Sequence, residues 1–179
     1  NVLTKSKVDM IKKILDYLIT NNKTISFDES CTGGNLSVSI TKIPGASKAF
    51  NGSIVSYSRY SKENIIGIEK NEIDIFSTVS QEIAIKMAEK VKEKFNSDYS
   101  IAVTGNAGPS TDGPESIVGD YFIAISSKSE IFCEKYNFVS SREDFIKTVT
   151  DNSFKLFIDK IIKRWVCFFS MLEYIIFAC

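Results

Sequence analysis

Histidine is missing from this sequence altogether, and its absence narrows the possible chemistry more than any other feature of the composition. Without an imidazole, neither a Ser-His-Asp triad nor a Cys-His pair can form. Zinc sites that depend on imidazole ligands and histidine proton shuttles are excluded for the same reason. If the protein is an enzyme with a serine or cysteine nucleophile, its base is therefore a lysine, aspartate, glutamate or tyrosine.

Net charge is also missing, because 22 basic residues balance 22 acidic ones. A balanced chain without a run of basic residues lacks the positive field that attracts polyanions, so no nucleic-acid partner is expected. The four cysteines show no C-x-x-C spacing, and the first residues lack the pattern of a secretory signal. Disulfide and metal sites are therefore both disfavoured, and a reducing, cytoplasmic setting is expected.

Hydrophobic periodicity predicts an α/β fold, and 179 residues with 44% hydrophobic content suit one domain with a substantial core. Helices are predicted at 4–22, 35–43, 80–95 and 141–163, with a short helix capped by Ser58. Strands are predicted at 24–28, 53–57, 99–103, 121–126 and 131–138, the last two forming an edge hairpin. Strands that alternate with helices before a late hairpin predict a three-layer α/β/α sandwich with a mixed β-sheet.

The end of the chain differs in composition from the rest. Residues 165–179 contain a single charge, Glu173. They are too few for an ordinary membrane span, which needs about 20 apolar residues, so no membrane partner is assigned. Extra helix packing or self-association, a weak membrane contact, and an end not native to the fold all stay open. We therefore divide the chain into a domain at 1–164 and an apolar tail at 165–179.

Three short constellations contain residue types that can carry chemistry. The first, Glu29-Ser-Cys-Thr-Gly-Gly34, lies between a predicted strand and a predicted helix. Such a turn exposes a side chain, while the helix N-terminus aims unpaired N–H groups at the same point. Ser30 and Cys31 are rival nucleophiles, and an ordinary capped helix start is the alternative interpretation.

The second constellation runs from Tyr57 to Lys62, at the end of the second predicted strand. Lysine becomes a useful base when burial or neighbouring cations lower its pKa, and a cleft near a strand end provides such surroundings. Serine–lysine variants of the triad give the pair a chemical precedent. Because most lysines are solvated and most strand-end tyrosines serve packing, the pattern alone leaves both interpretations open.

The third constellation, Val103-Thr-Gly-Asn-Ala-Gly-Pro109, follows the third predicted strand. Glycine-rich loops past the carboxyl ends of strands are where open α/β sheets bind ligands. Its spacing matches neither a P-loop nor a dinucleotide-binding fingerprint. A tight turn without further function is the alternative.

In this order, the three constellations resemble the C-terminal domain of the CinA (competence/damage-inducible) family, whose stand-alone members are nicotinamide-nucleotide amidases. The resemblance runs from about residue 5 to about residue 162, and Ile43-Pro-Gly-Ala-Ser47, Gly52-x-x-Val-x-Tyr-Ser58 and Val79-Ser80 also carry it. It implies the three-layer α/β/α fold. It also implies hydrolysis of nicotinamide mononucleotide to nicotinate mononucleotide and ammonia, without a metal or cofactor.

The resemblance also implies roles for individual residues. Ser30 would attack the carboxamide carbon, Lys62 would take its proton and later assist departure of ammonia, and Tyr57 would orient or polarise the pair. Backbone N–H groups of the glycine turns at 33–34 and 104–105 would hold the oxyanion and the nucleotide's phosphate or ribose, and a guanidinium would pair with the phosphate. The implied substrate-binding residues are Glu29, Thr32, Gly33, Gly34, Thr104, Gly105, Asn106, Gly108 and Arg142.

Three positions, Asp28, Asn106 and Asp120, depart from the family's more apolar pattern. An acid at position 28, beside the nucleophile turn, would raise the pKa of the lysine, so that less of it is neutral and able to act as a base. Two other functions therefore stay open. One is a non-catalytic nucleotide-binding or regulatory module, and the other is a serine–lysine hydrolase of another amide or ester. A homodimer likewise stays open as an alternative to a monomer.

Overall fold

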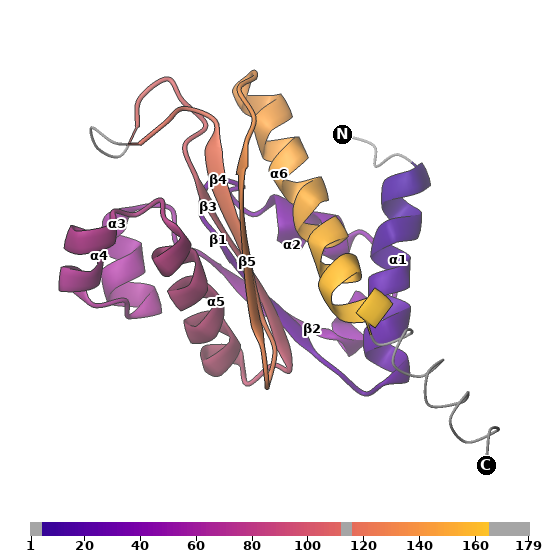
Figure 1. Cartoon of the computed structure of the whole chain (residues 1–179). Coiled ribbons are helices and arrows are strands. Elements are labelled where there is room, and N and C mark those ends of the chain that lie inside the picture. The colour runs from indigo at the N-terminus through magenta and orange to yellow at the C-terminus, as the bar shows by residue number, and fades with distance from the viewer. Residues whose placement is uncertain (1–4, 112–115, 165–179) are drawn as a thin grey trace, which may run out of the picture.

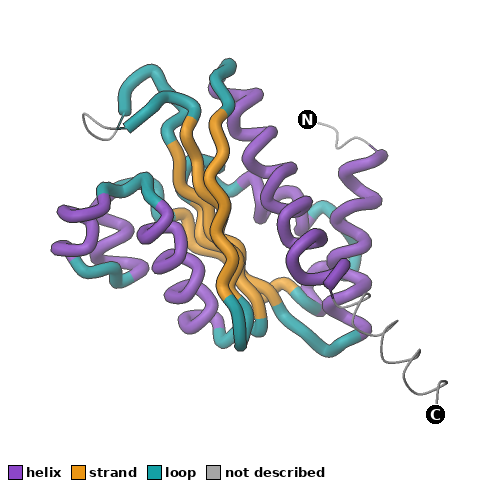
Figure 2. Tube along the Cα trace, viewed as in Figure 1, coloured by secondary structure: helices purple, strands orange, loops and turns teal. Residues whose placement is uncertain are grey.

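The computed structural model describes residues 5–111 and 116–164, which build a five-stranded mixed sheet between two layers of helices (Figures 1 and 2). The strands lie in the order β2-β1-β3-β4-β5. The first three are parallel to one another, and the β3–β4 and β4–β5 pairs are antiparallel. Their bounds are β1 (Ile25–Glu29), β2 (Phe50–Val55), β3 (Tyr99–Gly105), β4 (Asp120–Ser126) and β5 (Ile131–Asn137). The predicted three-layer α/β/α sandwich and its late edge hairpin are confirmed.

Helices cover both faces of the sheet (Figure 1). One face carries α1 (Lys5–Thr20), α2 (Asn35–Thr41) and α6 (Arg142–Phe157), which continues into the π-helical turn η3 (Ile158–Ile162). The other face carries α3 (Arg59–Ser61), the π-helical turn η2 (Lys62–Ile66), α4 (Lys70–Phe76) and α5 (Gln81–Phe95). A short turn, η1 (Ala46–Lys48), leads from α2 into β2.

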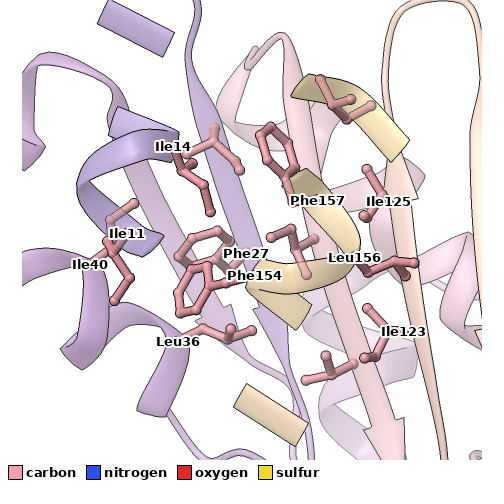
Figure 3. Packing of buried hydrophobic residues seen from close by; sticks show 14 of the residues in the cluster. Ile11, Ile14, Phe27, Leu36, Ile40, Ile123, Ile125, Phe154, Leu156 and Phe157 are labelled. Atoms are coloured by element: carbon pink, nitrogen blue, oxygen red, sulfur yellow. The ribbon is translucent and has the colours of Figure 1, made fainter. Parts of the chain in front are cut away.

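Strand β1 is buried along its whole length, so its alternate side chains enter two different cores. Phe27 joins the core beneath α1, α2 and α6, where its ring meets Phe154 edge-on with 6.1 Å between centroids (Figure 3). Ser26 faces α5, where its hydroxyl donates to the Val91 carbonyl at 3.3 Å. Asp28, two residues further along, therefore lies on the α5 side of the sheet.

Helices begin at the predicted capping residues, whereas one strand ends earlier than predicted because its pairing partner ends there. Ser80 Oγ accepts the Ile83 N–H at 3.2 Å and opens α5 as predicted. Strand β2 ends at Val55 because its partner there is Glu29, the last residue of β1, so Tyr57 follows the strand instead of belonging to it. Helix α4 is not among the predicted helices, since seven residues are too few to show an apolar stripe.

Two segments with predicted features lie outside the described residues. These are 112–115, within the glycine-rich connection, and the apolar tail at 165–179. Within residues 5–111 and 116–164, no helix combines the length and the apolar character needed to cross a bilayer.

Candidate active site

The carboxyl ends of β1, β2 and β3 meet at one edge of the sheet, at the upper end in Figure 1, and a cleft of about 420 Å³ opens there. This edge is the usual ligand site of open α/β sheets, and the volume lies in the range of small-molecule sites. The first residue of α6 and the segment before α5 complete its walls. Six predicted site residues line the cleft: Ser30, Tyr57, Gly105, Asn106, Gly108 and Arg142.

Ser30 is the first residue after β1, and backbone hydrogen bonds hold it from both sides. Its N–H donates to the Val103 carbonyl at 3.0 Å, which extends the pairing of β1 with β3 by one residue. Its carbonyl accepts the Gly33 N–H at 3.1 Å and closes the turn. The side chain of Ser30 is thereby fixed at the floor of the cleft.

Lys62 reaches the same point from the helical segment that follows β2. Ser58 and Ser61 form a reciprocal capping box that fixes the start of α3, and η2 follows directly. Lys62 and Ile66 lie one turn apart in η2 and are both buried. The capped start of this segment therefore directs Lys62 toward the end of β1. The predicted short helix after Ser58 is confirmed.

The serine and the lysine form a hydrogen-bonded pair. Lys62 Nζ lies 2.8 Å from Ser30 Oγ and donates a second bond to the Ser56 carbonyl at 2.7 Å. The side chain of Lys62 is only 1% exposed, and such burial disfavours the charged form of an amine. A neutral Nζ would accept the Ser30 proton across the same separation, which is the geometry that a general base requires.

Asp28 lies behind this pair. Its Oδ1 accepts the Ser56 hydroxyl at 2.6 Å, and its Oδ2 has no hydrogen-bond partner among the described residues. Burial raises the pKa of Asp28 to about 7, against the opposing effects of the Ser56 hydrogen bond and the charge of Lys62. A second titratable group therefore stands next to the nucleophile and its base.

Cys31, the rival nucleophile, is placed less favourably than Ser30. It lines the cleft beside Ser30 but is only 6% exposed and packs into the core beneath α1, α2 and α6, and burial raises the pKa of its thiol to about 12. A thiol that keeps its proton at neutral pH is a poor nucleophile. The lysine donates to Ser30 Oγ instead, so the geometry favours the serine.

Glu29 caps helix α2 from within the fold, in contrast to its predicted place in the substrate site. Its carboxylate accepts the N–H groups of Gly34, Leu36 and Ser37 at 2.9 to 3.0 Å and the Thr32 hydroxyl at 2.8 Å. A buried carboxylate needs such donors, and the N-terminus of a helix provides them. The helix N-terminus is thus occupied by Glu29 and is not aimed at the cleft.

The same contacts engage the N–H groups of the first glycine turn, which are predicted oxyanion donors. The Gly34 N–H is held by Glu29 and the Gly33 N–H by the Ser30 carbonyl, so neither is available to a ligand. Thr32, Gly33 and Gly34 do not line the cleft. The glycines instead allow the positive φ angles, 57° and 100°, that the turn requires.

The second glycine turn lies at the cleft wall, although one of its residues points elsewhere. Thr104 is buried, and its hydroxyl donates to the Thr78 carbonyl at 2.7 Å, which ties β3 to the segment before α5. Gly105 lines the cleft, and a Cβ there would lie 2.5 Å from the Cβ of Tyr121. Asn106 also lines the cleft; its N–H is held by the Asp120 carbonyl at 2.8 Å, and its buried Nδ2 has no hydrogen-bond partner among the described residues.

Arg142 begins α6 and carries a charge that no carboxylate of the described residues neutralises. It donates to the Tyr57 hydroxyl at 3.3 Å and to the Gly108 carbonyl. Arg59, also at the cleft, is by contrast paired with Glu63 and Asp74. The Tyr57 hydroxyl is therefore hydrogen-bonded to the arginine, and the arginine is the cation at the cleft that is open to an anionic ligand.

Several residues of the site are not indicated by any pattern in the sequence. Ser56 connects Lys62 to Asp28, yet a serine inside a predicted strand carries no signal of that role. The cleft wall also includes Ser58, Thr78 and Val79, which only the spatial meeting of separate loops brings together. Within the described ranges, no group of three histidine, cysteine, aspartate or glutamate side chains is arranged to hold a metal ion.

A three-layer α/β sandwich with a buried serine–lysine pair at the carboxyl ends of its parallel strands defines the class of protein. The chain belongs to the CinA C-terminal domain family, whose model matches residues 7–161. It is 39% identical over 158 residues to a CinA-like protein of Flavobacterium psychrophilum and 41% identical over 155 residues to one of Fervidobacterium nodosum. These matches cover 88% and 87% of this chain but only 38% of each relative.

Solved structures of the same superfamily share the fold. The competence damage-inducible protein A of Klebsiella pneumoniae superposes with a TM-score of 0.84 at 20% identity, covering 87% of this chain and 97% of that chain. A CinA superfamily protein of Enterobacter cloacae superposes with a TM-score of 0.83 at 25% identity, covering 89% and 94%. The described sheet and helices are thus those of the superfamily.

Proposed function

We propose that this chain hydrolyses the carboxamide of nicotinamide mononucleotide to nicotinate mononucleotide and ammonia, with Ser30 as nucleophile and Lys62 as base. The observation that carries the proposal is the 2.8 Å separation of Ser30 Oγ, which lines the cleft, from Lys62 Nζ, which is buried behind it. The identity of the substrate is inferred from the resemblance of the sequence motifs to those of nicotinamide-nucleotide amidases. A nucleotide substrate also fits the expected cytoplasmic setting.

The first half of the reaction forms an acyl-enzyme. Ser30 Oγ attacks the carboxamide carbon while its proton passes to Lys62 Nζ, which gives a tetrahedral oxyanion. The ammonium of Lys62 then donates that proton to the leaving nitrogen, the C–N bond breaks, and ammonia departs. The nicotinoyl group remains as an ester on Ser30.

The second half restores the enzyme. A water molecule entering from the cleft attacks the ester carbon, and Lys62 Nζ takes one of its protons. The bond to Ser30 Oγ breaks, the serine recovers a proton from Lys62, and nicotinate mononucleotide leaves as a carboxylate after its remaining proton passes to solvent or to the released ammonia. Each turnover consumes one amide and one water, so neither an oxidant nor a reductant is needed.

Charge and shape at the cleft suit an anionic nucleotide. Arg142 offers the guanidinium to the phosphate, and its bond to Tyr57 gives the tyrosine a positioning role. With Gly33 and Gly34 engaged elsewhere, the turn at Gly105 remains as the source of oxyanion donors at the cleft wall. These assignments belong to the same proposal.

The test is a substrate panel in buffer that contains a metal chelator. Ammonia and nicotinate mononucleotide are quantified with nicotinamide mononucleotide, nicotinamide riboside, nicotinamide, and unrelated amides and esters. We expect the mononucleotide to give the highest kcat/KM. Turnover of another amide or ester with the mononucleotide inert would identify a different hydrolase. A thermal shift with the mononucleotide but no turnover would identify a binding module.

A further inference from the structure

Asp28 and Lys62 meet through a shared residue behind the reactive serine. The Ser56 hydroxyl donates to Asp28 Oδ1 at 2.6 Å, and the Ser56 carbonyl accepts from Lys62 Nζ at 2.7 Å. Asp28 and Ser56 are fully buried, and Lys62 is 1% exposed. Three hydrogen bonds therefore link Asp28 to Ser56, Ser56 to Lys62 and Lys62 to Ser30, with the hydroxyl and the carbonyl of Ser56 serving its two partners.

The surroundings of Asp28 leave Lys62 as the cation that faces it among the described residues. Asp28 is flanked in register by Ile54 of β2 and Ala102 of β3. Helix α5 covers this side of the sheet with apolar buried residues: Ile83, Ala84, Met87, Ala88 and Val91. Besides Lys62, the titratable group that acts on Asp28 is Glu29, whose carboxylate caps α2, and the buried Cys31 interacts with both Lys62 and Glu29.

An apolar setting makes the charges of the two groups depend on each other. A buried carboxylate stabilises the protonated form of a nearby amine, and the ammonium in turn stabilises the carboxylate. Because Asp28 Oδ2 has no hydrogen-bond partner among the described residues, few local donors screen its charge from Lys62. Loss of the carboxylate would leave the ammonium buried without a compensating charge.

We propose that Asp28 is a positioning residue for the Ser30–Lys62 pair: its carboxylate holds the proton on Lys62 and so sets the pH at which the pair becomes reactive. Asp28 does not touch the substrate and acts through Ser56 and through its charge. The catalytic consequence rests on the proposed function, whereas the coupling of the two groups is a property of the fold. The raised pKa of Asp28, about 7, brings its change of charge into the neutral range.

Nuclear magnetic resonance titration tests the coupling without any turnover. Lysine labelled with ¹³C at Cε and aspartate labelled at Cγ are followed in the wild type, Asp28→Asn, Lys62→Met and Asp120→Asn. We expect Asp28→Asn to lower the titration midpoint of Lys62 by about one to three pH units, the usual effect of an adjacent opposite charge. Reciprocally, Lys62→Met should raise the midpoint of Asp28, since interacting groups lose their protons as a pair.

Asp120→Asn is the matched control, because Asp120 is also buried but pairs with Lys135 and Asn137 instead. It should leave the Lys62 midpoint unchanged. An unchanged Lys62 midpoint in folded Asp28→Asn would overturn the proposal. If Asp28→Asn does not fold, the Asp28 signal in Lys62→Met decides, and an Asp28 midpoint equal to that of the wild type overturns it.

A pH–rate profile separates this proposal from the proposed function. With nicotinamide mononucleotide, the alkaline-rising limb of kcat/KM should move to lower pH in Asp28→Asn by the same amount as the Lys62 midpoint. If the midpoints of Asp28 and Lys62 are coupled but no ammonia is released, the proposed amidase function is overturned and the coupling stands. Ammonia release by a protein in which the midpoints of Asp28 and Lys62 do not depend on each other would support the amidase and overturn the coupling.

Discussion

Lys62 Nζ lies 2.8 Å from Ser30 Oγ although 32 positions separate the two residues in the chain. Parallel register produces this meeting, because Glu29 pairs with Val55 and the next residues of both strands therefore leave the sheet side by side. The lysine then returns from η2 to the Ser56 carbonyl. A shift of one residue in the register would turn alternate side chains to the opposite face and separate the pair.

Substitution of the rival thiol should leave catalysis in place. We expect Cys31→Ala to keep ammonia release from nicotinamide mononucleotide within a factor of about three of wild type, because a protonated, buried thiol contributes little as a nucleophile. Alkylation of the native protein by iodoacetamide at pH 7 should be slow at this position, measured by mass spectrometry. Loss of turnover in a folded Cys31→Ala variant would instead point to the cysteine.

Removal of the guanidinium at the cleft should weaken binding of the phosphate. Arg142→Ala is expected to raise KM for nicotinamide mononucleotide by about 10- to 100-fold, the usual contribution of a charge-assisted hydrogen bond. KM for nicotinamide riboside, which lacks the phosphate, should change little. Lys155→Ala, a loss of one cation in the last turn of the same helix, is the control. Equal changes in KM for both substrates would contradict a phosphate contact.

The internal cap of α2 predicts a specific loss of stability. Glu29→Ala should lower the free energy of unfolding by about 2 to 4 kcal/mol, because it leaves one buried and two partly buried N–H groups at the start of the helix without their acceptor. Glu69→Ala is the matched control, since Glu69 precedes α4 without capping it through its side chain. That control should stay within about 0.5 kcal/mol of wild type in urea unfolding. Similar losses in both variants would contradict the cap.

The raised pKa of Asp28 predicts how stability depends on pH. The folded state holds the Asp28 proton up to about pH 7, whereas the unfolded chain releases it near 3.8. Its contribution to stability is therefore fully present below about pH 4 and is lost as the pH rises through 7. Relative to Asp28→Asn, which has no carboxyl to titrate at this position, the wild type should accordingly lose roughly 2 to 4 kcal/mol of stability between pH 4 and pH 8. A pH-independent difference in urea unfolding would contradict the assignment.

Much of the fold is predictable because local rules agree with it. The apolar stripe of α5 and its Ser80 cap both mark the helix in the sequence. The late hairpin is visible because β4 and β5 are separated by a short polar turn. The end of β2 is not predictable in this way, since the length of β1 decides where pairing stops.

The site is predictable in its motifs and less so in its contacts. Ser30, Lys62 and Arg142 stand out as residue types near turns, and the structure brings all three to the cleft region. The role of Glu29 was not predictable, because an acid before a glycine turn can face either a ligand or a helix end. The link from Asp28 through Ser56 depends on the register of two strands, which no single segment encodes.

Ammonia release from nicotinamide mononucleotide by the wild type, Ser30→Ala, Lys62→Met and the double variant tests the central claim most directly. We predict turnover in the wild type and a loss of at least about 10³-fold in each single variant, with no further loss in the double variant, because the two residues act as one unit. Near-normal release by folded Ser30→Ala or Lys62→Met, or none from a folded wild type, would contradict the serine–lysine amidase.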